Sequence, residues 1–175
     1  MATLGFQTSR LTVKNWDAEL GNPAALEELS NELRSILSPA VLAFLPPSMR
    51  LNVEKDPILP WIQDRNAESD VLEVRDNGVL IGLVILAFDD SALNLETVHI
   101  GYLFGEEFWG QGYASELVQS LVNALAARAP IEIVGGVDTG NPASARVLEK
   151  VGFRKSNASV GGETVKYSLE LRAVR

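Results

Sequence analysis

Residues 95–128, LETVHIGYLFGEEFWGQGYASELVQSLVNALAAR, decide the fold of this chain. Their first part, Leu95 to Phe104, is apolar enough to form a buried strand, and the spacing of apolar side chains predicts a helix from Tyr113 to Arg128. Between them lies a loop with glycines at positions 105, 110 and 112. The sequence therefore predicts a strand, a glycine-rich loop and a helix in direct succession.

The loop has the features of an anion-binding site. Small residues at positions 110, 112 and 114 allow a ligand to approach the backbone closely. The N–H groups at a helix N-terminus have no partner within the helix, and with the helix dipole they favour an anion such as a pyrophosphate. A plain strand-to-helix turn would have the same pattern, so both interpretations are open at this point.

Two other glycine loops do not fit the sequence. The chain has no G-x-x-x-x-G-K-S/T stretch, which a P-loop requires. A dinucleotide-binding fingerprint would need a third glycine or alanine where the chain has Ser115, and the preceding strands are predicted to form a meander instead of a βαβαβ unit. An ATP-binding enzyme is poorly supported, because no lysine or magnesium-binding pair accompanies the loop.

Local signals predict the elements on either side of this stretch. Asn22-Pro23 is typical of a helix start, Asn77-Gly78 predicts a β-hairpin, and Gly152 suits a helix C-terminus. In chain order we expect a strand at 9–13, a helix from 22 that Pro39 breaks, and short helical pieces at 41–45 and 57–65. Strands at 71–75, 79–88 and 95–104 are expected next, followed by a helix at 113–128, a strand at 131–137 and a helix at 143–151. A hairpin of 153–158 with 163–171 comes last, and turns are expected at Asp89-Asp90-Ser91 and Gly161-Gly162. This order predicts an α/β fold, a mixed sheet with helices on both faces.

Composition narrows the class of protein. The 175 residues fit one domain, and 46% hydrophobic with 22% charged residues is typical of a globular protein in water. There is no run of 18 apolar residues and no signal-peptide pattern, so we expect no membrane contact and a cytoplasmic location. The absence of cysteine and the single histidine, His99, argue against thiol catalysis and against a metal site.

The net charge of −8 disfavours nucleic acid as a partner and is compatible with a cationic substrate. Solubility alone would also explain an acidic chain. The glutamates at positions 106 and 107 flank the glycine loop, where we expect them to be solvated and able to attract a cationic amine.

Two long motifs resemble a known enzyme family. The stretch from His99 to Phe104, with Trp109-Gly110-Gln111-Gly112-Tyr113-Ala114-Ser115-Glu116, resembles acetyl-CoA motif A of the GNAT N-acetyltransferases. Asn141 to Phe153 is similar to the Asn-x-x-Ser-x-x-x-Leu-x-Lys-x-Gly-Phe motif of the RimJ/RimL-like branch, the N-terminal acetyltransferases of ribosomal proteins and their relatives. Ser9-Arg10-Leu11-Thr12-Val13 resembles the first strand of that branch. The resemblance covers about residues 8–171 and implies a single acetyltransferase domain over residues 1–175.

The resemblance implies a mostly antiparallel sheet that splays between the strand ending at Phe104 and the strand at 131–137, with acetyl-CoA in the gap. The pyrophosphate of acetyl-CoA would meet the N–H groups of residues 110–114, and its pantetheine would pair like an extra strand with residues 102–104. Asn141 and Ser144 match positions that approach the pantetheine arm or the thiol. The implied cofactor-binding residues are Tyr102, Leu103, Phe104, Trp109, Gly110, Gln111, Gly112, Tyr113, Ala114, Asn141 and Ser144.

The chain departs from the family pattern at three positions. Trp109 stands where the broad superfamily has Gln or Arg, although Trp is common in the RimJ/RimL-like branch. Leu148 stands where many members have a Tyr that protonates the leaving thiolate, so that Asn141, Ser144 or water must take this role. His99 stands where relatives often have Glu.

His99 is the favoured general base. Strand alternation places it on one face with Thr97 and Gly101, and an imidazole ionises near neutral pH, which suits removal of a proton from an ammonium. The alternative is that the ring of His99 has its hydrogen-bond partners within the sheet, or only shapes the acceptor pocket. Glu96 is the second candidate base. The alternative is that Glu96 is only a surface charge at the end of a strand. The implied catalytic residues are His99, Asn141 and Ser144.

Four aromatic residues, Trp16, Phe44, Trp61 and Phe88, are candidates for lining an acceptor cleft. Core packing is the alternative for each of them, and we expect it for most.

The sequence thus predicts a cytoplasmic, acetyl-CoA-dependent N-acetyltransferase. A neutral amine attacks the thioester carbonyl, a tetrahedral oxyanion forms and the CoA thiolate leaves, while the protein aligns the reactants and polarises the carbonyl. The acceptor is a protein N-terminus or a small-molecule amine, and the sequence leaves a homodimer open. The alternative, which Leu148 keeps open, is a non-catalytic acyl-CoA-binding or sensing module on the same fold.

Overall fold

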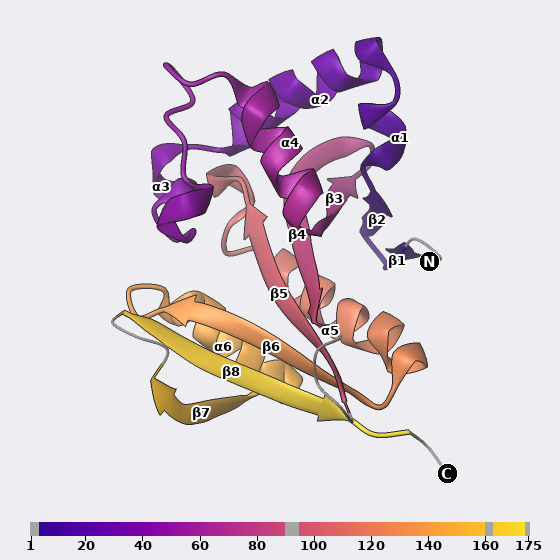
Figure 1. The fold of residues 1–175 in the computed structure, drawn as a ribbon, viewed down its shortest axis with the longest axis vertical. Coiled ribbons are helices and arrows are strands. Elements are labelled where there is room, and N and C mark those ends of the chain that lie inside the picture. Colours follow the sequence, from indigo (N-terminus) through magenta and orange to yellow (C-terminus); the bar gives the residue numbers. More distant parts are fainter. Residues whose placement is uncertain (1–3, 90–94, 160–162, 174–175) are drawn as a thin grey trace. The chain divides into compact units, whose positions relative to one another are not determined.

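The computed structural model describes residues 4–89, 95–159 and 163–173, and Figure 1 traces the chain. Its strands are β1 (Phe6–Gln7), β2 (Leu11–Asn15), β3 (Asp70–Asp76), β4 (Val79–Asp89), β5 (Glu96–Phe104), β6 (Ile131–Asp138), β7 (Arg154–Ser159) and β8 (Thr164–Leu171). Its helices are α1 (Asp17–Leu20), α2 (Pro23–Ile36), α3 (Pro39–Leu42), α4 (Ile58–Glu68), α5 (Tyr113–Leu125) and α6 (Pro142–Val151), with short 3-10 turns at Pro47–Met49, Glu106–Phe108 and Ala126–Arg128.

The strands follow the order β1-β2-β3-β4-β5-β6-β8-β7. The pair β5–β6 is parallel, whereas β1–β2, β2–β3, β6–β8 and β7–β8 are antiparallel. The residues group into two compact units, Met1–Ile85 with Tyr102–Gln111 and Leu86–Gly101 with Gly112–Arg175, and both β4 and β5 run from one unit into the other. The predicted α/β fold with a mixed, mostly antiparallel sheet is confirmed.

In the first unit, α2 begins as predicted at Asn22-Pro23. Asn22 Oδ1 accepts hydrogen bonds from the N–H groups of Ala24 at 3.0 Å and Ala25 at 3.3 Å, and Pro23 takes the first helical position. The apolar face of α2 packs into a core that joins α2, α3 and α4 to β3, β4 and the end of β5. The core residues are Trp16, Leu29, Leu33, Ile36, Leu37, Val41, Leu42, Ile58, Trp61, Ile62, Val71, Leu80, Leu83, Ile85 and Leu103.

The turn between β3 and β4 lies where Asn77-Gly78 predicts it. Asn77 has φ 48° and Gly78 has φ 84°, so both are in the left-handed region. A two-residue hairpin of type I′ needs positive φ at both central positions, and Asn-Gly adopts these angles at least cost.

In the second unit, β5 pairs with β6 from Glu96↔Ile131 to Ile100↔Gly135, and β6 pairs with β8. Figure 1 shows α6 behind the ribbons of β6 and β8, on one face of these strands. Gly135 faces this helix, since a Cβ placed on it would lie 3.0 Å from Leu148 Cδ1. One face of these strands therefore packs against α6, and alternate residues point to the opposite face.

Several element boundaries differ from the sequence prediction. The helix expected to reach Arg128 ends at Leu125 and continues as a 3-10 turn. The strand expected at 9–13 lies at 11–15, because Thr8 Oγ1 accepts from the N–H of Leu11 at 2.8 Å and closes a turn before it. Pro39 breaks α2 as predicted, yet it also starts α3.

The two elements β1 and α1 were not predicted, and each is very short. The predicted turns at Asp89-Asp90-Ser91 and Gly161-Gly162 fall at or within segments that lie outside the described residues. No helix in the described part of the chain is long and apolar enough to cross a membrane.

Candidate active site

The glycine loop adopts backbone angles that explain its composition. Gly110 has φ 73° and Gly112 has φ 81°, a region that residues with a Cβ rarely enter. A Cβ on Gly110 would meet no heavy atom within 4 Å, so the backbone angle and not crowding requires glycine there. Residues 110–112 are exposed. The loop thus presents backbone to solvent without side-chain cover at its two glycines.

Helix α5 begins directly after this loop. Its N-cap is Gly112, which has no side chain to accept hydrogen bonds from the first N–H groups of the helix. Most helices receive such bonds from Ser, Thr, Asp or Asn. A glycine N-cap therefore leaves donors that an anion can use, which fits the diphosphate-binding role predicted for residues 110–114.

Side-chain hydrogen bonds hold the loop in shape. Trp109 Nε1 donates to the carbonyl of Phe104 at 2.8 Å, which ties the loop to the end of β5. Gln111 Nε2 donates to the carbonyl of Glu107 at 2.7 Å, and Arg10 Nη1 donates to the carbonyl of Gln111 at 3.0 Å. The sequence singled out Arg10 only as part of a family-like first strand, and this contact shows that it reaches the predicted site.

Trp109 and Phe44 form an exposed aromatic pair beside the loop. Their ring centroids are 6.4 Å apart, and 44% of Trp109 and 40% of Phe44 is exposed. The other candidates for an acceptor cleft differ, because Trp16 and Trp61 are buried in the core of the first unit. Phe88 is half-buried, and the guanidinium carbon of Arg128 lies 4.2 Å from the centroid of the Phe88 ring. Core packing is thus confirmed for Trp16 and Trp61.

The remaining predicted pantetheine and helix residues are less exposed. Leu103, Phe104 and Tyr113 are buried, whereas Tyr102 and Ala114 are half-buried.

The acidic residues before the loop are exposed, as expected. Glu106 accepts a short hydrogen bond from the hydroxyl of Ser38, and this contact links the loop to the start of α3.

The start of α6 brings two predicted residues together. Asn141 Oδ1 accepts from the N–H of Ser144 at 3.1 Å, so that Asn141 is the N-cap of α6 and Pro142 takes the first helical position. Leu148 of the same helix is buried and packs against β6. The position where relatives often have Tyr is therefore part of the core and holds no proton donor.

His99 lies on the face of β5 opposite to α6. It is exposed, whereas its neighbours Val98 and Ile100 are buried, as the predicted alternation requires. Its register partner is Val134, which in turn faces Ser168 on β8. Among the described residues, no hydrogen bond to the imidazole of His99 is found, so this ring is available to a ligand or to water.

Glu96, the second candidate base, is engaged elsewhere. Arg128 Nε donates to Glu96 Oε2 at 3.2 Å, and the guanidinium also binds the other carboxylate oxygen. This two-point ion pair, with the Arg128 guanidinium over the ring of Phe88, holds the side chain of Glu96 at the start of β5.

The pKa values of Glu73 and Tyr167, which lie outside these residues, are both raised. Burial raises the pKa of the Glu73 carboxyl on β3, and the hydrogen bond and charge of Arg75 oppose this rise. Burial, with the hydrogen bond and charge of Glu149, raises the pKa of Tyr167 on β8, whose hydroxyl donates to Glu149 Oε1 at 3.2 Å.

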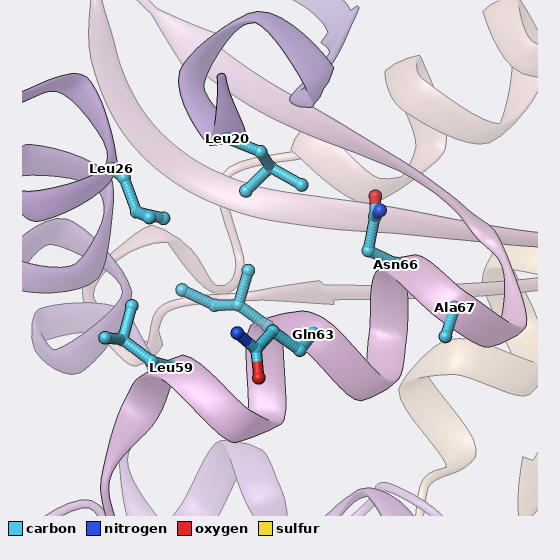
Figure 2. Close-up of a pocket in the computed structure, with 7 residues that line it drawn as sticks. Leu20, Leu26, Leu59, Gln63, Asn66 and Ala67 are labelled. Atoms are coloured by element: carbon cyan, nitrogen blue, oxygen red, sulfur yellow. The ribbon is translucent and has the colours of Figure 1, made fainter. Parts of the chain in front are cut away.

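A cavity of about 240 Å³ opens between α1, α2 and α4 in the first unit (Figure 2). Its lining is apolar apart from Gln63 and Asn66, and Asn66 Oδ1 accepts from Trp16 Nε1 at 2.9 Å. A neighbouring groove of about 380 Å³ shares Leu26 and Leu59 with it. None of the predicted site residues lines either space. Within residues 4–89, 95–159 and 163–173, no cluster of His, Asp or Glu side chains could hold a metal ion.

Comparison with known proteins places these features in a family. The family model described as the acetyltransferase (GNAT) domain matches residues 20–154. Two curated proteins of Bacillus subtilis strain 168 are similar in part. The uncharacterized protein YkkB is 36% identical over 64 residues, which cover 36% of this chain and 37% of YkkB. The uncharacterized N-acetyltransferase YoaA is 35% identical over 85 residues, which cover 48% of this chain and 47% of YoaA.

The matched part of this chain therefore spans less than half the length of either curated relative. Among solved structures, the fold is similar to RimL, a ribosomal L7/L12 alpha-N-protein acetyltransferase in complex with coenzyme A. The TM-score is 0.69 at 17% identity, and the match covers 94% of this chain and 96% of RimL. At this identity, the likeness shows a shared fold.

Proposed function

The chain belongs to the acetyltransferase (GNAT) domain family, and from this membership we propose that it is an acetyl-CoA-dependent N-acetyltransferase that acts on a primary amine. The observation that carries the proposal is the passage from β5 through the loop with two left-handed glycines into a helix whose N-cap has no side chain. This arrangement offers backbone N–H groups to an anion, and acetyl-CoA has a diphosphate that needs such donors.

Each group of proposed cofactor-binding residues is assigned to one part of acetyl-CoA. Residues 110–114 would bind the diphosphate, residues 102–104 the pantetheine, and Asn141 with Ser144 the region of the thiol. In support, residues 110–112 are exposed.

Acetyl-CoA supplies the acetyl group as an activated thioester. The neutral amine of the acceptor forms a bond to the carbonyl carbon, the carbon–sulfur bond breaks, and the sulfur leaves with the electron pair. The amine loses one proton and the thiolate gains one, so the protein must provide a path for both. The backbone amides of β5 would stabilise the negative charge that develops on the carbonyl oxygen.

His99 is the proposed base. Its imidazole is exposed on β5, whereas the carboxylate of Glu96 is bound by Arg128. The hydroxyl of Ser144, the amide of Asn141 or water is the proposed proton source for the thiolate, since Leu148 is a buried hydrocarbon.

The acceptor is proposed to be a protein N-terminus or a small-molecule amine, in a cytoplasmic setting. The RimJ/RimL-like motif and the fold shared with RimL, an N-protein acetyltransferase, favour a protein N-terminus. The test is release of CoA thiol in the presence of acetyl-CoA and a panel of peptides, polyamines, amino acids and aminoglycosides, with each product identified by mass spectrometry.

Cofactor binding is tested separately by Gly112→Leu. A bulky side chain at φ 81° would project into the proposed diphosphate site and should abolish acetyl-CoA binding in calorimetry. Gly78→Leu is the matched control, because Gly78 has φ 84° but lies in the β3–β4 hairpin. Unchanged affinity in folded Gly112→Leu protein would remove the diphosphate assignment.

A second candidate function is a non-catalytic acyl-CoA-binding module. The buried Leu148 in place of a tyrosine acid favours it. Acetyl-CoA binding without turnover on the whole panel would support this alternative over the enzyme.

A further inference from the structure

Arg10 is presented to the glycine loop by a rigid turn. Between β1 and β2, Thr8 N–H donates to the carbonyl of Leu11 at 2.9 Å, and Thr8 Oγ1 accepts from the N–H groups of Leu11 at 2.8 Å and Arg10 at 3.3 Å. Leu11 itself is buried. The backbone of Arg10 is thus fixed on the sheet of the first unit, and only its side chain extends toward the loop.

The side chain of Arg10 binds a residue 101 positions away. Its Nη1 donates to the carbonyl oxygen of Gln111 at 3.0 Å. Gln111 is held a second time, because its own Nε2 donates to the carbonyl of Glu107 at 2.7 Å. Gln111 is therefore fixed at both its carbonyl and its side chain, although it lies between two glycines in an exposed loop.

This contact determines which way the next N–H points. The Gln111–Gly112 peptide is trans, and in a planar trans peptide the C=O and N–H bonds point in opposite directions. When Arg10 holds the carbonyl of Gln111, the N–H of Gly112 must point away from Arg10. Because glycine tolerates both signs of φ, an unanchored peptide before Gly112 could rotate and present its carbonyl oxygen in place of the N–H.

We propose that Arg10 is a positioning residue for the diphosphate of acetyl-CoA, and that it acts by holding the Gln111–Gly112 peptide with its N–H toward the anion. The inference rests on the proposed function, since it assigns a role within the same loop. A carbonyl oxygen that faced the diphosphate would repel it, so loss of the anchor weakens binding without any contact between Arg10 and the ligand.

The test compares two ligands on three variants. Calorimetry gives the Kd of acetyl-CoA, and ligand-observed NMR gives the Kd of S-acetylpantetheine, which lacks the diphosphate. Arg10→Ala should weaken acetyl-CoA binding by about 10-fold, which corresponds to the loss of one hydrogen bond to a charged group. The Kd of S-acetylpantetheine should be unchanged. Arg10→Lys retains a donor and should recover most of the affinity.

Arg34→Ala is the matched control. Arg34 is also exposed in the first unit, and its Nη1 donates to a backbone carbonyl, that of Val53, at 2.6 Å. This variant loses the same charge and the same kind of hydrogen bond away from the loop, so acetyl-CoA should bind it as it binds the wild type.

Three outcomes overturn the inference. The first is unchanged acetyl-CoA binding by Arg10→Ala. The second is an equal loss for both ligands, which indicates a general change of fold. The third is a loss that vanishes in about 0.5 M salt, which indicates a screened charge in place of a fixed peptide. If the wild type itself fails to bind acetyl-CoA, the proposed function fails instead. Should Arg10→Ala not fold, Arg10→Gln provides the uncharged variant.

Discussion

Glu73 is a carboxylate buried on β3, an environment that disfavours its charge. Its side chain has no exposed surface, and its Oε1 has no partner among the described residues. The second oxygen binds Arg75 Nε at 2.6 Å and lies 3.8 Å from Lys14 Nζ. Arg75 is shared with Glu32, and Lys14 is shared with Glu19. Three carboxylates thus face two cations, which leaves one negative charge without compensation.

This imbalance predicts a pH dependence of stability. Burial raises the pKa of Glu73 in the folded state above its usual 4.5, so between 4.5 and the raised value the folded protein binds more protons than the unfolded chain. The contribution of Glu73 to the free energy of unfolding should therefore fall as pH rises through that window. Glu73→Gln should flatten this part of the profile, measured by urea denaturation from about pH 4.5 to 8.

Glu28→Gln is the control for that series, because Glu28 is an exposed glutamate of the same unit. It removes the same formal charge and should leave the pH slope as it is in the wild type. Parallel profiles for wild type and Glu73→Gln would show that Glu73 does not take up the proton.

His99 gives the second prediction at the residue scale. If its imidazole accepts the proton of the amine, His99→Gln should lower turnover by about 10²-fold or more. Acetyl-CoA affinity should persist, since the His99 side chain lies outside the glycine loop. Turnover is measured with an identified acceptor. A variant that keeps the wild-type rate would leave His99 as a residue that shapes the pocket.

At the scale of elements, glycines set how closely strands and helices approach. A Cβ on Gly82 of β4 would lie 2.3 Å from the backbone oxygen of Leu103 and 2.9 Å from Phe104 Cδ1, whereas the nearest atom to a Cβ on Gly135 is the terminal methyl Leu148 Cδ1 at 3.0 Å. A backbone oxygen in a sheet cannot move aside, but a leucine methyl can rotate.

Gly82→Ala should therefore destabilise the protein by about 2–3 kcal/mol, and Gly135→Ala by about 1 kcal/mol or less, in denaturant unfolding. Gly82→Ala should also raise the KM for acetyl-CoA, because the strain falls on residues 103 and 104, where the pantetheine is proposed to pair. Equal losses of stability in the two variants would contradict this account of the close approach.

For the molecule as a whole, the net charge gives a prediction about the acceptor. The chain has a net charge of −8, so a cationic acceptor is attracted from a distance and salt screens the attraction. Among the amines that the panel identifies as acceptors, kcat/KM should fall more steeply with ionic strength for those of higher positive charge. The comparison runs from about 0.02 to 0.3 M salt, where the screening length changes most. If kcat/KM depends on ionic strength in the same way for all acceptors, the net charge has no part in the encounter between the protein and the acceptor.

Local sequence signals are sufficient to predict the features that depend on near neighbours in the chain. Asn22-Pro23 and Asn141-Pro142 start helices, Asn77-Gly78 forms the hairpin, and Gly152 ends α6 with φ 108°. Caps and tight turns are stabilised by groups within four residues, so local pattern is sufficient to predict them. The two motifs likewise predicted the family that residues 20–154 match.

Features that depend on partners far along the chain are set by tertiary packing. Trp16 is buried in the core, whereas 44% of Trp109 is exposed, although both are tryptophans. Glu96 is occupied by Arg128, and Arg10 reaches Gln111. The short elements β1 and α1 have too few residues to give a periodic signal. Burial and long-range hydrogen bonds arise only when packing brings distant segments together, and no local pattern of residue types specifies that outcome.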